Sequence, residues 1–175
     1  MENLVIAVLG NPTAGSINEL TKLASSCECN VIESRMMVLG SKFTANMHLA
    51  GNWNAIAKFE TLLPVLEKKL DVRIVAQRTS LENQLLDQLP YVAYIIALSQ
   101  PIVLHEVTSF FADQGIDIRE LYSESYTTKH TQAIMLSITL TVNVPTTIAI
   151  ADLRERFQIF CDRCNYDGVM EPDKG

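Results

Sequence analysis

One pattern of apolar segments occurs twice in the sequence, and the two copies keep a constant offset along the chain. The first helical stripe and the strand that follows it align in both halves without a gap. The matched positions, each pair 87 residues apart, are Leu20 with Val107, Leu23 with Phe110, Asn30 with Asp117, and Val31 with Ile118. An internal repeat predicts that one fold is present in two copies, each with a core of its own.

The order of segments within each copy indicates which fold is repeated. Short apolar runs and period-two alternation are typical of strands, and apolar residues three or four positions apart are typical of helices. The first copy has strands at 4–9, 29–39, 43–49 and 72–77, and helices at 17–27 and 56–70. The second has strands at 91–99, 116–126, 134–142 and 166–171, and helices at 104–111 and 145–160. We therefore predict an α+β protein with two ferredoxin-like βαββαβ modules in tandem, residues 1–79 and 91–175, joined by a linker at 80–90.

Three local features refine this prediction. Ser16, with Glu19 three residues later, has the spacing of a capping box at the start of the first helix. Trp53 stands where the second helix begins, and we expect it to anchor that helix to the sheet. Pro64 lies inside the second helical pattern, where a missing N–H and a ring clash cost about 3 kcal/mol. We expect the helix to break or kink there.

The composition excludes several classes of protein. Hydrophobic residues make up 48% of the 175 residues and charged residues 19%, which argues against a disordered chain. No apolar stretch approaches the ~20 residues that a membrane helix needs. A formal net charge of −6 disfavours a protein that binds nucleic acid by neutralising phosphates. The start Met1-Glu2-Asn3 has no basic region, so we expect no secretory signal and a cytoplasmic protein.

The four cysteines form two closely spaced pairs, Cys27 with Cys29 and Cys161 with Cys164. Four thiolates could hold a zinc ion. However, the two pairs belong to different halves, and a cysteine is often a small buried apolar residue. We expect reduced thiols in the cytoplasm, and neither a metal site nor a cofactor.

Residue types used in catalysis are present but scattered. His48, His105 and His130 lie in separate segments, and none has the neighbours of a catalytic triad or a metalloprotease motif. Glu33 and Glu120 occupy matching positions of the two copies, where they are either matched interface contacts or solvated carboxylates. The sequence therefore predicts a protein that is not an enzyme.

The segment 10–15, Gly-Asn-Pro-Thr-Ala-Gly, joins the first strand to the first helix. Two glycines allow close approach of a small molecule, and the N–H groups at a helix N-terminus suit a carboxylate. An ordinary tight turn has a similar composition, so this pattern alone leaves both interpretations open. In the second copy Ile102 replaces Gly15, which makes the first loop the better candidate for a ligand site.

A strand, this Gly/Pro loop, and a helix followed by Cys29-Asn30-Val31 resemble the ACT domain, a small regulatory module that binds amino acids. Segments 25–35, 39–44, 51–56 and 70–75 resemble the family of transcriptional repressors of the glycine cleavage system. The resemblance is specific in the first copy and covers the whole chain in layout. It implies regulation without catalysis: such repressors sense glycine and act through a LysR-type activator protein, without reading DNA themselves.

The resemblance also implies where a small amino acid would bind. In ACT modules the ligand lies at an interface between modules, held by the first loop and the start of the second strand. The residues that match these positions are Asn11, Pro12, Thr13, Ala14, Gly15, Asn30 and Val31. The order of residues in this loop departs from the family pattern, so the alternative is a protein-interaction module with a decayed ligand site. Open sheet edges make a homodimer the expected assembly.

Overall fold

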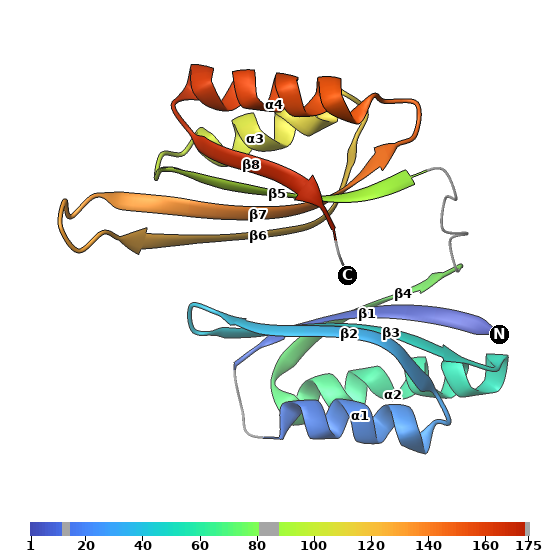
Figure 1. Cartoon of the computed structure of the whole chain (residues 1–175). Helices are drawn as coiled ribbons and strands as arrows, with labels where there is room; N and C mark the ends of the chain where they lie inside the picture. Colours follow the sequence, from blue (N-terminus) through green and yellow to red (C-terminus); the bar gives the residue numbers. More distant parts are fainter. Residues whose placement is uncertain (12–14, 81–87, 174–175) are drawn as a thin grey trace. The chain divides into compact units, whose positions relative to one another are not determined.

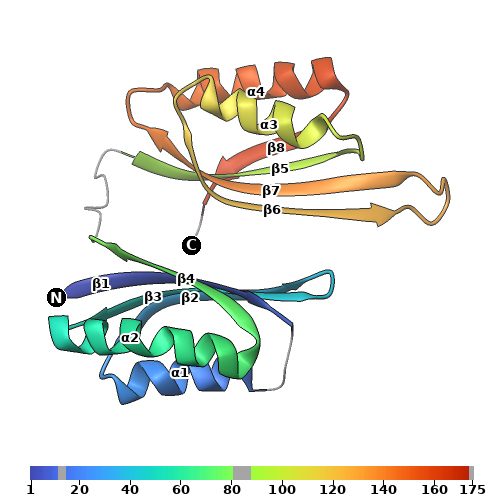
Figure 2. The same ribbon diagram turned by 180° about the vertical axis from the view of Figure 1, so that it is seen from behind.

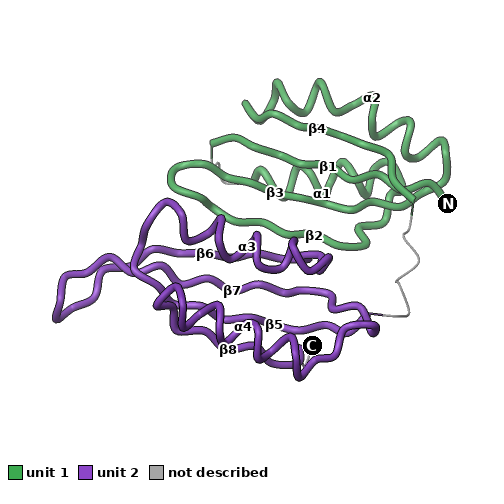
Figure 3. Tube along the Cα trace, turned by 90° about the horizontal axis from the view of Figure 1, so that it is seen from above, with its two compact units in different colours: residues 1–83 green, residues 84–175 purple. Residues whose placement is uncertain are grey.

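The computed structural model describes residues 1–11, 15–80 and 88–173. The chain divides into two compact units, Met1–Asn83 and Gln84–Gly175, which we call module 1 and module 2 (Figure 3). The first strand of module 2 begins at Gln88, three residues before the expected start at 91. Most of the predicted linker, residues 81–87, lies outside the described residues. The boundaries 1–79, 80–90 and 91–175 stay predictions.

Module 1 has the predicted order of elements. They are β1 (Glu2–Gly10), α1 (Ser16–Ser26), β2 (Asn30–Leu39), β3 (Lys42–Gly51), α2 (Trp53–Leu70) and β4 (Val72–Thr79). The strands form one antiparallel sheet in the order β2-β3-β1-β4. Both helices cover the same face of this sheet (Figure 1).

Module 2 repeats the arrangement. Its elements are β5 (Gln88–Leu98), α3 (Val103–Ala112), β6 (Asp117–Thr127), β7 (Ile134–Pro145), α4 (Ile150–Cys164) and β8 (Asp167–Pro172). The antiparallel sheet has the order β6-β7-β5-β8, and α3 and α4 lie together on one face (Figure 2). The prediction of two ferredoxin-like βαββαβ modules is confirmed.

The repeat holds at single-residue precision in the first part of each module. Helix α1 starts at Ser16 and α3 at Val103, and β2 starts at Asn30 and β6 at Asp117. The strand register is interrupted at the same place in both sheets, between Val31 and Glu33 and between Ile118 and Glu120. The matching positions predicted for Glu33 and Glu120 are therefore confirmed as the residues that follow a shared β-bulge.

Each module has its own core between its sheet and its helices. In module 1, Leu4 and Ile6 of β1 pack with Leu20 of α1 and Phe59 of α2. In module 2, three phenylalanine rings, Phe110, Phe111 and Phe157, lie within 6.0 Å of one another between centroids. The two clusters share no residue, as the repeat predicts.

Pro64 does not break α2, which runs from Trp53 to Leu70. The predicted break is wrong because Pro64 lies on the exposed side of the helix, whereas Leu63 and Leu66 beside it are buried. Burying two leucines contributes roughly 3–6 kcal/mol, which offsets the ~3 kcal/mol cost of the proline.

Three other local predictions are also wrong. Gly15 is the N-cap of α1, and Ser16 is already the first helical residue, so no capping box forms. Trp53 is 62% exposed and anchors nothing, because the buried stripe of α2 begins only at Ala55. The segment from 145 does not open a helix: β7 continues to Pro145 because its apolar alternation ends with the buried Val144, and α4 begins at Ile150.

Candidate ligand-binding site

The loop after β1 starts from a tightly packed position. At Gly10, a Cβ atom would lie 2.5 Å from Cγ1 of Val72 on β4, so only glycine fits there without movement. Asn11 follows and is exposed, and its side-chain oxygen accepts a hydrogen bond of 2.6 Å from Nζ of Lys42. Lys42 is the first residue of β3. A positive charge therefore lies beside the loop that was predicted to hold a ligand.

The other end of the same loop is Gly15, the residue that precedes α1. Gly15 is exposed and has a φ of 94°, a left-handed conformation that favours glycine. Among the described residues, no atom other than those of its chain neighbours lies within 4 Å of the position that a Cβ would take. The N-cap Gly15 has no side chain that could cap α1, and a helix N-terminus favours a negatively charged group. Pro12, Thr13 and Ala14, also predicted for this site, lie outside the described residues.

Asn30 and Val31 are both exposed on β2, but they do not lie near the loop. Asn30 pairs with Ala50 of β3, whereas Gly10 pairs with Phe43, at the other end of that strand. The separation is seven residues along β3, roughly 23 Å at about 3.3 Å per residue. A small amino acid cannot reach both sets of residues within one module.

The equivalent loop of module 2 has lost these polar features. Gly10 pairs with Phe43 in module 1, and Ala97 pairs with Leu136 in module 2, so Asn11 and Lys42 correspond to Leu98 and Met135. These two apolar residues pair with each other in the sheet. Ile102, the counterpart of Gly15, is 47% exposed. Between these two loops, as far as the structure describes them, module 1 alone combines an exposed glycine, an amide and a cation.

Sequence reasoning missed Lys42. The residue follows the turn Gly40-Ser41, and its position in the sequence carries no sign of a ligand site. Its proximity to Asn11 depends on the β1–β3 register, which brings residues 31 positions apart into hydrogen-bond distance. Only the tertiary pairing of the strands could reveal it.

The cysteines are packing residues in this structure. Cys27, Cys29 and Cys161 are buried, and burial raises the pKa of the Cys29 thiol and that of the Cys161 thiol, the latter to about 11. The two pairs lie in different modules. Within residues 1–11, 15–80 and 88–173, no group of three or more His, Cys, Asp or Glu side chains could hold a metal ion.

His48 is half-buried on β3, and its Nε2 lies 3.1 Å from the side-chain oxygen of Asn3.

In the described part of the chain, no helix is both long and apolar enough to cross a membrane.

Comparisons with known proteins agree with this architecture. The family model of the ACT domain matches residues 2–77. A glycine cleavage system transcriptional repressor from Escherichia coli K12 is 32% identical over 167 residues, covering 95% of this chain and 88% of the relative, and one from Shigella flexneri matches equally.

Two solved structures share the fold over nearly the whole chain. One, of a protein proposed to be a glycine cleavage system transcriptional repressor, has a TM-score of 0.77 at 24% identity and covers 99% of this chain and 98% of its own. The other, of an unknown protein from Galdieria sulphuraria, has a TM-score of 0.82 at 20% identity and covers 98% of both chains. On the identity and coverage of the two bacterial relatives, this chain belongs to the family of glycine cleavage system transcriptional repressors, which are regulators.

Proposed function

We propose that this chain is an amino-acid-responsive repressor of the glycine cleavage operon, and that its ligand is glycine or another small amino acid. The family membership supports the regulatory role, and the name of the relatives motivates glycine. The observation that carries the ligand site is the polar loop of module 1. Asn11, Gly15 and Lys42 offer an amide, a glycine at a helix N-terminus and a positive charge.

The chemistry of these groups matches the ends of an amino acid. Lys42 and the N–H groups at the start of α1 would bind the α-carboxylate, because both stabilise negative charge. The carbonyl of Asn11 would accept a hydrogen bond from the α-ammonium group if Lys42 turned toward the carboxylate. The open space beside Gly15 leaves room for a ligand that lacks a long side chain.

The distance between the two sets of predicted residues is compatible with a site built from two copies of the chain. Asn30 and Val31 lie at the other end of the sheet from Asn11 and Gly15, so a ligand would contact the loop of one copy and β2 of the other. Every residue of β2 is exposed, and β2 is an outer strand of its sheet. Such an edge is suited to pairing, and we propose that a homodimer completes the site.

Repression is proposed to act through a protein partner, a LysR-type activator, without direct reading of DNA. The net charge of −6 opposes binding to phosphates. Glycine would change the affinity for the activator only to the extent that it prefers one state of the repressor. Electrophoretic mobility shift assays with operator DNA should show no shifted band with this protein alone. With the activator present, this protein should change the shifted band that the activator forms, and the change should depend on glycine.

Titration calorimetry with glycine tests the ligand site. Replacing Lys42 by methionine removes the charge and keeps most of the side-chain volume, and it should weaken glycine binding about tenfold, the effect of one charge-assisted hydrogen bond. Lys68→Met is the matched control, because Lys68 is an exposed lysine on α2 outside the loop. Equal affinities of the two variants would contradict the role of Lys42.

A second candidate function is a protein-interaction module with a decayed ligand site. The separation of Asn30 and Val31 from the loop favours it, because one module alone cannot enclose a ligand with these residues. The two functions differ in the same titration. Absence of heat with glycine and with other small amino acids at millimolar concentration, together with unchanged binding to the activator, would support the second function.

A further inference from the structure

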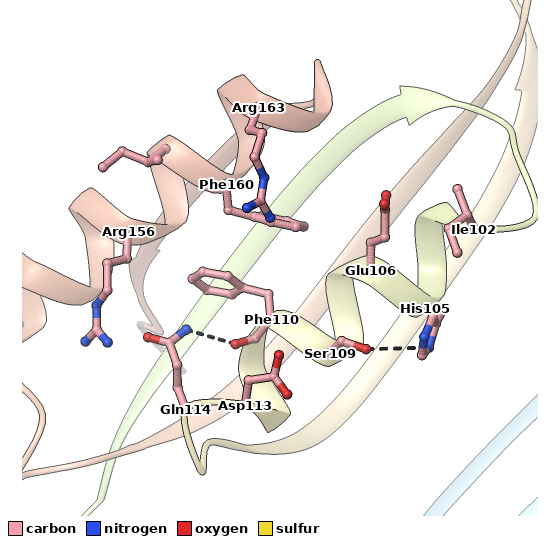
Figure 4. Close-up of a pocket in the computed structure, with 11 residues that line it drawn as sticks. Ile102, His105, Glu106, Ser109, Phe110, Asp113, Gln114, Arg156, Phe160 and Arg163 are labelled. Atoms are coloured by element: carbon pink, nitrogen blue, oxygen red, sulfur yellow. Dashed lines mark hydrogen bonds between the residues drawn. The ribbon is translucent and has the colours of Figure 1, made fainter.

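A groove of about 600 Å³ lies between α3 and α4 of module 2, remote in sequence from the loop of module 1 (Figure 4). Phe110 and Phe160 form its apolar floor, with stacked rings whose centroids are 4.9 Å apart. The volume falls within the roughly 300–1,000 Å³ that is usual for small-molecule sites.

The two walls of the groove carry opposite charges. Glu106 and Asp113 belong to the α3 side, and Arg156 and Arg163 extend from α4 toward it (Figure 4). Each pair is spaced by seven residues, two helical turns, so its members lie on one side of the helix. Among the ion pairs found in the described residues, none joins the two walls.

In module 1, an ion pair joins the two helices at the equivalent place. There, Nζ of Lys69 on α2 lies 2.6 Å from a carboxylate oxygen of Glu19 on α1, and this hydrogen bond lowers the pKa of Glu19. Glu106 is the repeat counterpart of Glu19. Aligning α2 and α4 on the left-handed residues that end them, Asp71 and Asn165, makes Arg163 the counterpart of Lys69.

Among the described residues of module 2 the equivalent bond is absent, and a different group bonds to one oxygen of the carboxylate. The hydroxyl of Tyr166 donates a hydrogen bond to Glu106. Burial, and secondly this hydrogen bond, raise the pKa of Tyr166 well above its usual value, so the hydroxyl keeps its proton. Arg163 then has no hydrogen-bond or ion-pair partner among the described residues and can bind an external anion.

The second arginine stands at a position that is apolar in module 1. The same alignment places Arg156 opposite Leu62, which packs against the core of module 1. Replacing a packed leucine by an arginine removes apolar contact between the helices and adds a second charge to the groove. At Arg163, module 2 lacks the ion pair that Lys69 makes in module 1, and at Arg156 it lacks the packed side chain of Leu62. We infer that both differences leave the groove of module 2 more open.

An unsatisfied acceptor lies at one end of this groove. The amide nitrogen of Gln114 donates to the carbonyl of Phe110 at 2.9 Å, which fixes the orientation of the amide. The other polar atom of that amide, Oε1, is a buried side-chain oxygen without a hydrogen-bond partner in the described part of the chain. If the side chain rotated slightly, a hydrogen-bond donor on a bound ligand could reach this oxygen. The ligand would then satisfy an acceptor that is otherwise unpaired.

We propose that the α3–α4 groove is a second ligand site and that it binds a free amino acid with an apolar side chain. The α-carboxylate pairs with Arg156 or Arg163, and the α-ammonium group with Asp113, Glu106 or the free oxygen of Gln114. The apolar side chain lies on the rings of Phe110 and Phe160. A zwitterion satisfies both walls at once, whereas a simple anion would leave the acidic wall unpaired.

Titration calorimetry on the full chain tests this proposal with phenylalanine and leucine as probes. Phenylalanine should bind, whereas N-acetylphenylalanine, which lacks the ammonium charge, and phenylalaninamide, which lacks the carboxylate, should each bind about tenfold more weakly or worse. Equal affinity of phenylalanine and either analogue would overturn the zwitterion requirement. No heat with phenylalanine or leucine at 10 mM (on the order of the weakest useful affinity) would overturn the site.

Variants separate this site from the proposed glycine site. Arg163→Met should weaken phenylalanine binding about tenfold and leave glycine binding unchanged. Lys42→Met should weaken glycine binding and leave phenylalanine binding unchanged. Lys68→Met again serves as the control, and circular dichroism checks that each variant is folded. Loss of phenylalanine binding in Lys42→Met but not in Arg163→Met would assign the ligand to the loop. Binding of a mixed-charge peptide, lost in Arg163→Met while no amino acid binds, would make the groove a protein interface instead.

Discussion

The two separate cores predict that a small cavity in one module destabilises that module alone. Ile6 on β1 and Ile95 on β5 are both 0% exposed, and each belongs to the core of its own module. Removing one methylene by Ile→Val should cost about 1 kcal/mol at either position. For a domain of this size that cost lowers the melting temperature by about 4–8 °C.

The chain carries spectroscopic probes that distinguish the modules. The single tryptophan, Trp53, is in module 1, and all five tyrosines are in module 2. Thermal unfolding followed by tryptophan fluorescence should shift in Ile6→Val, and the tyrosine near-ultraviolet signal should shift in Ile95→Val. Hydrogen exchange resolved by peptide gives the same comparison without relying on the exposed tryptophan. Equal shifts of both probes in both variants would refute two independent cores.

Two further predictions concern single residues. Pro64→Ala should raise the stability of module 1 by about 1–2 kcal/mol, because alanine restores an N–H donor on the exposed side of α2; a lower melting temperature by tryptophan fluorescence would contradict this. The pKa of Cys161 is raised to about 11, so folding favours the neutral thiol, and its contribution to stability should be lost as the pH rises from about 9 to 11. Urea titrations across that range, with Cys161→Ala as the control, would show no extra loss if this reasoning is wrong.

The repeat was readable from the sequence because apolar periodicity is a local property of each segment. The alternation in β3 and β7 and the stripes of α1 and α3 follow from which residues must be buried. Apart from Pro64 in the interior of α2, the failures were at segment ends. Ser16 and Trp53 were assigned roles at helix starts that depend on where the backbone enters the helix, and the sequence pattern locates such boundaries least well.

For the candidate site too, local sequence patterns predicted some features and missed others. The loop containing Asn11 and Gly15 could be selected from its glycines and from Ile102 at the matching position, and the structure leaves both residues exposed. The sequence offered no reason to include Lys42, and it did not show that Asn30 lies about 23 Å from Gly10. Both facts follow from the order β2-β3-β1-β4 and its register.

The amino-acid sequence by itself determined that one α+β unit is present twice, which segments are strands and helices, and that the chain is acidic. The tertiary structure alone decided which side chains meet. Lys42 reaches Asn11 through strand pairing, and Glu106 meets Tyr166 while its counterpart Glu19 meets Lys69. The physical reason is that the need to bury one face sets the spacing of apolar residues within each helix or strand separately. Which strand residues pair, and which helix residues touch, depends on segments that are far away in the sequence.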